Sequence, residues 1–92
     1  MISEEELIKH KWKYIPESKF WEKLGVNFRN TDRESNYYTL YFSDTLSSFV
    51  RALTLHDLED SVRTGVSSIF FYKKYQTDLS IKQKRTLKNW IL

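Results

Sequence analysis

Residues 54–75, "TLHDLEDSVRTGVSSIFFYKKY", decide between two architectures for this chain of 92 residues. Their apolar residues fall within about 120° of one another on a helical wheel, which is typical of a helix packed against a core. These residues are Leu55, Leu58, Val62, Val66, Ile69 and Phe70. The stripe predicts one continuous helix that begins at Thr54. The alternative ends that helix at Gly65 and makes residues 66–75 a strand that pairs with residues 37–42.

The chain as a whole is poor in residues that form turns, because it has two glycines and one proline. This scarcity favours helices over a sandwich or barrel with many turns. Near the N-terminus, Ser3 and Glu6 have the spacing of a capping box and predict a helix start. Pro16 predicts the first turn of a second helix, which Gly25 would end.

The middle of the chain contains one convincing strand candidate. It is "YYTLYF", residues 37–42, which is aromatic and β-favouring. The polar residues 27–36 predict the longest loop. Residues 43–53 predict a helix capped by Ser43 or Asp44, because the apolar residues of this stretch recur at helical spacing.

The elements together predict a mainly α fold, in a single domain that spans residues 1–92. Ser80 and Gln83 form a second capping box, which predicts a last helix that runs to about Ile91. We therefore expect a small bundle of four to five helices. The alternative is an α+β fold with a short β-hairpin.

Composition excludes several classes of protein. The chain has no cysteine, which excludes disulfide frameworks and thiolate metal sites. It has no run of about 18 apolar residues, so no segment is predicted to span a membrane. Its start, "MISEEELIKHKWKY", is acidic and then basic, and it lacks the apolar stretch of a signal peptide. We expect a cytoplasmic protein that does not bind membranes.

Basic charge gathers at the C-terminal end. The formal net charge is +3, and residues 73–92 hold six basic residues against the single acid Asp78, a net +5 from six minus one. On a helical wheel Lys82, Lys84, Arg85 and Lys88 fill one arc, and Gln83, Leu87, Trp90 and Ile91 fill the opposite arc. The cationic arc can neutralise phosphates and release counterions. The alternative is a solvated face with lysines near the negative end of the helix dipole.

Two aromatic residues precede this helix. Phe71 and Tyr75 are four residues apart, with Lys73 and Lys74 between them in sequence. Rings beside lysines can stack nucleobases along a single strand, so these four residues join the candidate binding site. The alternative is that the N-terminal segment covers the two rings.

Signs of catalysis or metal binding are weak. His56, Glu59 and Asp60 lie on one side of a predicted helix, which is half of a possible divalent metal site without a second half. The chain has neither a G-x-S-x-G motif nor a glycine-rich phosphate loop. We expect no catalytic residue, no metal and no cofactor.

The segment "SSIFFYKKYQTDLSIKQKRTLKNWI", residues 67–91, resembles a helix–turn–helix ending found in assorted small bacteriophage proteins, some linked to DNA replication. The shared pattern is L-[ST]-x-K-Q-x-x-x-L, which Leu79, Ser80, Lys82, Gln83 and Leu87 match. The resemblance implies a phage or mobile-element origin. We expect a non-enzymatic accessory protein that binds nucleic acid through the basic C-terminal helix face. The alternative is a protein-binding module, such as a phage-encoded inhibitor that docks on an acidic host protein surface.

Overall fold

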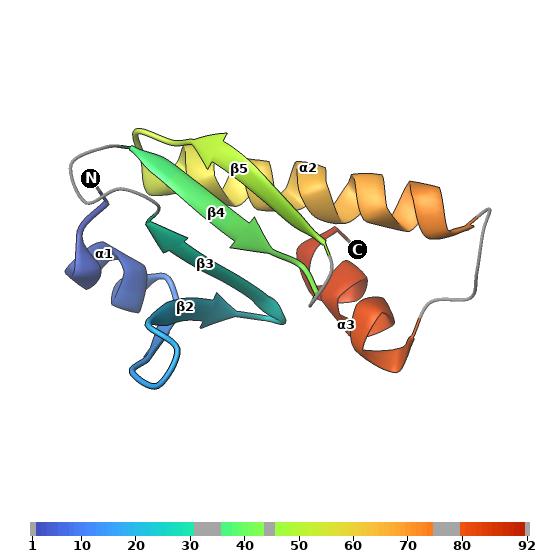
Figure 1. Ribbon diagram of the computed structural model, residues 1–92, viewed down its shortest axis with the longest axis horizontal. Helices are drawn as coiled ribbons and strands as arrows, with labels where there is room; N and C mark the ends of the chain where they lie inside the picture. The colour runs from blue at the N-terminus through green and yellow to red at the C-terminus, as the bar shows by residue number, and fades with distance from the viewer. Residues whose placement is uncertain (1, 31–35, 44–45, 75–79, 92) are drawn as a thin grey trace.

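A computed structural model describes residues 2–30, 36–43, 46–74 and 80–91, except the side chains of residues 70–74 (Figure 1). Five strands follow the first helix, and two helices complete the chain. The elements are α1 (Glu4–Lys9), β1 (Lys13–Ile15), β2 (Phe20–Lys23), β3 (Val26–Asn30), β4 (Tyr37–Tyr41), β5 (Ser47–Arg51), α2 (Leu55–Lys74) and α3 (Ile81–Trp90).

The strands form one antiparallel sheet in the order β1-β2-β3-β4-β5, so each strand pairs with its neighbours in sequence. The fold is therefore α+β, and the predicted mainly α bundle is wrong. The prediction failed because two segments with helical spacing of apolar residues, 16–25 and 43–53, are parts of hairpins.

One face of the sheet carries the core. Val26 and Phe28 on β3 and Tyr38 and Leu40 on β4 are buried, whereas the residues between them are not. This alternation places every second side chain on the same face. The core also contains residues from or beside each of the three helices: Ile2, Leu7, Trp12, Leu55, Leu58, Val62, Val66, Leu87 and Trp90. All three helices therefore pack against one face of the sheet.

The predicted helix from Pro16 to Gly25 is a turn followed by strand β2 and a second tight turn. Leu24 and Gly25 have positive φ values of 49° and 88°, and they join β2 to β3 as a two-residue loop. Loops of this kind need positive φ and match the twist of the strands, which is why glycine is favoured there. Gly25 thus supplies the left-handed backbone expected of it, but in a hairpin rather than after a helix.

The predicted helix at residues 43–53 is wrong over the described residues, because Ser47–Arg51 is strand β5 and Ser43 and Leu46 lie in the β4–β5 connection. Residues 44–45, which include the alternative cap Asp44, lie outside the described residues. The hydroxyl of Ser43 accepts a hydrogen bond from the Leu46 amide at 3.2 Å. An N-cap uses the same spacing of three residues, so the local sequence signal is common to both structures. In the predicted loop at residues 27–36, β3 occupies the part up to Asn30, and residues 31–35 lie outside the described residues.

Four local predictions are confirmed. Residues 37–42 contain β4, which pairs with β3 and β5. Helix α2 is continuous through Gly65 to Lys74, and the Thr54 hydroxyl accepts from the Asp57 amide at 3.1 Å. The alternative strand at 66–75 is therefore wrong over the described residues. At α3, both hydrogen bonds of the Ser80–Gln83 capping box are present. At α1, Ser3 accepts from the Glu6 amide.

Three close contacts join the helices to the strands and the turns between them. A Cβ atom added at Gly65 would collide with the ring of Phe42, which shows how closely α2 crosses the end of β4. A Cβ atom added at Gly25 would collide with the Thr86 hydroxyl of α3. The indole N–H of Trp90 also donates to the Leu24 carbonyl at 3.3 Å. The β2–β3 turn therefore positions α3.

Gly25→Ala tests this contact. The positive φ should cost about 1–2 kcal/mol for a residue with a Cβ atom, and the collision with Thr86 should add to that cost. In a Thr86→Ala background only the backbone cost should remain. Urea unfolding of the two single variants and the double variant measures the coupling. An equal cost in both backgrounds would show that the turn does not press against α3.

Candidate nucleic-acid interface

Helix α3 has one cationic side and one packed side. Lys82, Lys84, Arg85 and Lys88, which we call the basic helix face, are all exposed. The opposite side buries Thr86, Leu87 and Trp90. Ile91 is 42% exposed, so it does not complete the packed side as predicted. Gln83 is half-buried and completes the capping box.

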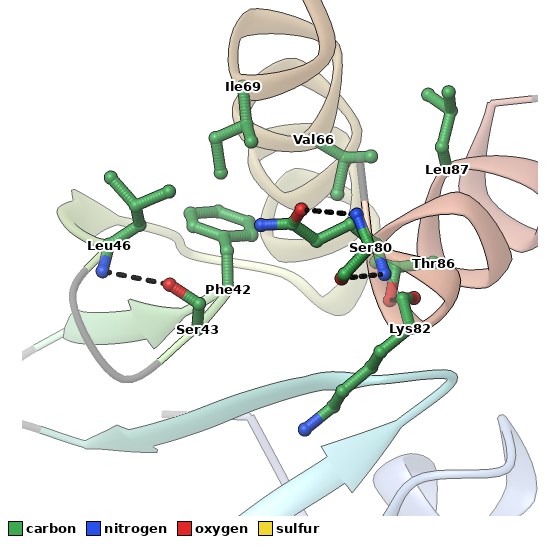
Figure 2. Close-up of a pocket in the computed structure, with 10 residues that line it drawn as sticks. Phe42, Ser43, Leu46, Val66, Ile69, Ser80, Lys82, Thr86 and Leu87 are labelled. Atoms are coloured by element: carbon green, nitrogen blue, oxygen red, sulfur yellow. Dashed lines mark hydrogen bonds between the residues drawn. The ribbon is translucent and has the colours of Figure 1, made fainter. Parts of the chain in front are cut away.

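Lys82 is the one cation of the basic helix face that borders the cleft at the end of the sheet. This cleft has a volume of about 250 Å³, and Lys82 borders it together with Phe20, Asn27 and Tyr41. Lys82 also borders a pocket of about 160 Å³, with both apolar and polar lining residues, between the β4–β5 connection, α2 and α3. Figure 2 shows its side chain extending away from that pocket, towards the strands. The basic helix face therefore reaches the sheet through Lys82.

The other predicted binding residues are only partly described. Phe71, Lys73 and Lys74 are in the last turns of α2, but their side chains are not described. Tyr75 lies outside the described residues. The predicted stacking site at these four residues stays a prediction.

The three residues of the possible metal site do not converge on one point, because Glu59 has a different partner from His56 and Asp60. The Glu59 carboxylate is buried and forms a salt bridge with Lys23 of β2 at 2.5 Å. Asp60 instead pairs at the surface with His56 at 3.2 Å and with Arg63 at 3.1 Å. The packing of the sheet on α2 separates these carboxylates. Within the described part of the chain, no cluster of three or more potential ligands could hold a metal ion.

The face of the sheet opposite the helices carries aromatic residues that are far apart in the sequence. We call this the open sheet face. Phe20 and Tyr41 have ring centroids 5.0 Å apart, and Tyr37 and Phe49 stack at 5.2 Å with an interplanar angle of 6°. The guanidinium carbon of Arg29 lies 6.0 Å from the rings of both Phe20 and Tyr41.

Sequence reasoning missed this face because it assigned Phe20 and Phe49 to helices. Only the register of the sheet brings each of them beside a tyrosine of β4. The available signal was the alternation within β4, where Tyr37, Thr39 and Tyr41 share the face opposite to Tyr38 and Leu40.

No family model matches this chain, and neither a curated protein nor a solved structure matches it significantly. The resemblance of residues 67–91 to bacteriophage proteins therefore stays a prediction. Among the described helices, none is long and apolar enough to cross a membrane.

Glu59→Ala should destabilise the protein by about 3 kcal/mol, because it leaves the charge of Lys23 without its partner in a mostly buried site. Replacing both residues, as in Lys23→Met with Glu59→Leu, should recover most of that loss. Asp60→Ala is the control on the same helix, and it should cost less than about 1 kcal/mol because its partners are exposed. Urea unfolding measures all three. A Glu59→Ala cost no larger than that of Asp60→Ala would contradict the structural role of the buried pair.

Proposed function

We propose that this protein is a small, non-enzymatic nucleic-acid-binding protein and that the basic helix face contacts the phosphate backbone. The observation that carries the proposal is the division of α3. Its exposed side presents four cations, and its other side is buried by Thr86, Leu87 and Trp90. No acidic residue lies between Ile81 and Trp90 to oppose the cations.

The fixed orientation of α3 supports this proposal. The capping box at Ser80 fixes the start of the helix, and the Trp90 indole hydrogen-bonds the β2–β3 turn near its end. The cations therefore extend from a helix that is already fixed in place, so binding carries no entropic cost of ordering that helix. Lysine and arginine side chains in such a row neutralise phosphates and release counterions without reading the base sequence.

Replacing Lys84, Arg85 and Lys88 with Gln tests the proposal. These side chains are exposed, so each change should cost under about 0.5 kcal/mol of stability. Nucleic-acid binding should weaken for every base sequence alike. The slope of log K against log salt concentration should become shallower by about 2 units, since each lost phosphate contact removes about 0.7–0.9. Fluorescence anisotropy of labelled oligonucleotides across a salt series measures both effects.

The matched control removes three exposed cations from the other end of the chain: Lys9→Gln, Lys11→Asn and Lys19→Asn. Asn is chosen where the backbone has positive φ, at Lys11 and Lys19. Both triple variants lose the same charge, so only the α3 variant should lose the salt-dependent contacts. Equal weakening in both variants would mean that net charge alone attracts the polyanion. Feeble nucleic-acid binding by the parent would contradict the proposal and favour an acidic protein partner.

A further inference from the structure

The open sheet face is not covered by any helix of the described chain. The helices pack against the opposite face, and no strand residue that points to the open side is buried. Phe49 is 62% exposed and Tyr37 is 41% exposed. The solvent-facing side of an antiparallel sheet usually carries polar residues. Four aromatic side chains on this face therefore indicate a binding surface.

We propose that the open sheet face binds single-stranded nucleic acid by stacking bases on its two aromatic pairs. The inference rests on the proposed function and specifies the form of nucleic acid that is bound. Exposed aromatic rings on a sheet stack unpaired bases, and they do so with little sequence preference because every base has a π-face.

The spacing of the rings suits more than one base. Tyr37 and Tyr41 lie four residues apart on the same strand, which separates them by about 13 Å. Each tyrosine pairs with a phenylalanine of another strand, so β4 carries two separate stacking positions. A duplex keeps its bases stacked on one another, so it could offer this face only its backbone.

The charge of the face complements a nucleic-acid strand. Arg29 lies beside the Phe20–Tyr41 pair, and Arg51 is opposite Tyr37 in the sheet register. Arginine can contact phosphate through its guanidinium while it also lies against an aromatic ring. Glu22 is the one acidic residue on the described strands of this face, and its carboxylate accepts from the Gly25 amide at 3.0 Å.

The same charges argue against a second copy of this chain as the occupant, since pairing two open faces would bring arginines of like sign together.

The cleft at the end of the sheet connects the open sheet face with the basic helix face. Its wall contains Phe20 and Tyr41 from the open side and Lys82 from α3. A nucleic-acid strand whose bases stack on the aromatic rings can therefore extend its phosphates to the cations of α3.

The test replaces Tyr37 and Phe49 together with Ile, which keeps an apolar, strand-forming side chain but removes both rings. The control exchanges the rings, as Tyr37→Phe with Phe49→Tyr. Anisotropy with a labelled 20-nucleotide oligo-dT and with a 20-base-pair duplex measures binding. The Ile variant should bind oligo-dT about 5- to 100-fold more weakly for each base stack lost, with an unchanged salt slope and unchanged duplex binding. The ring-exchanged control should bind like the parent.

The outcomes separate this inference from the proposed function. If the Ile variant binds oligo-dT as well as the parent does, the stacking proposal is wrong, and the α3 triple variant still tests the basic helix face. A parent that prefers duplex to oligo-dT also overturns stacking but leaves the proposed function standing. A parent that binds neither overturns both. Self-association of the parent that the Ile variant abolishes would identify a second copy as the occupant and overturn the proposal.

Photochemical cross-linking of the unaltered protein gives a readout that does not depend on any variant folding. Oligo-dT that carries 5-bromouracil should cross-link to Tyr37, Tyr41, Phe20 or Phe49, located by mass spectrometry of the digested complex. Cross-links confined to α3 would contradict the proposal.

Discussion

The salt bridge between Lys23 and Glu59 is the charged contact that joins the sheet to the helices, and neither group can stay buried without the other. Lys23 lies opposite the fully buried Val26 in the register of β2 and β3, so its ammonium group points under the helices. There it meets Glu59 of α2 at 2.5 Å and lies 5.8 Å and 5.3 Å from the rings of Trp12 and Trp90. A charge in this position needs its partner, because desolvation without one costs several kcal/mol. One lysine therefore links the sheet to α2, α3 and the segment after α1.

All the described helices lie on one side of the sheet, and this placement explains the position of both surfaces for which we propose functions. Because α3 buries Thr86, Leu87 and Trp90 against the rest of the core, its four cations must face outward. Because no described helix covers the other side, the aromatic residues of β2, β4 and β5 stay accessible. The two surfaces meet where Lys82 borders the cleft at the end of the sheet. In the functions that we propose, the phosphates of a single-stranded nucleic acid contact the basic helix face and its unpaired bases stack on the open sheet face.

Sequence reasoning succeeded where the signal is local. The hydroxyls of Thr54 and Ser80 cap the helices that follow them, and the apolar stripe of α2 continues past Gly65. It failed where one local pattern fits two structures. Ser43 makes a capping-type hydrogen bond within a hairpin, and Gly25 supplies positive φ to a turn between strands. In these short segments the pairing with neighbouring strands outweighed the helical spacing of the apolar residues. Whether such a segment forms a strand depends on the other strands of the sheet, which are not part of the local sequence.

The sequence by itself determined where α2 and α3 begin, the strand at β4, and the cationic arc of the last helix. These features depend on residues that are close together in the chain. Tertiary structure alone decided that Glu59 turns inward to Lys23 while Asp60 stays at the surface. It also decided that Phe20 lies beside Tyr41 and that Phe49 lies beside Tyr37. The physical reason is that strand register and the choice of covered face come from contacts between residues far apart in the chain, which no local periodicity encodes.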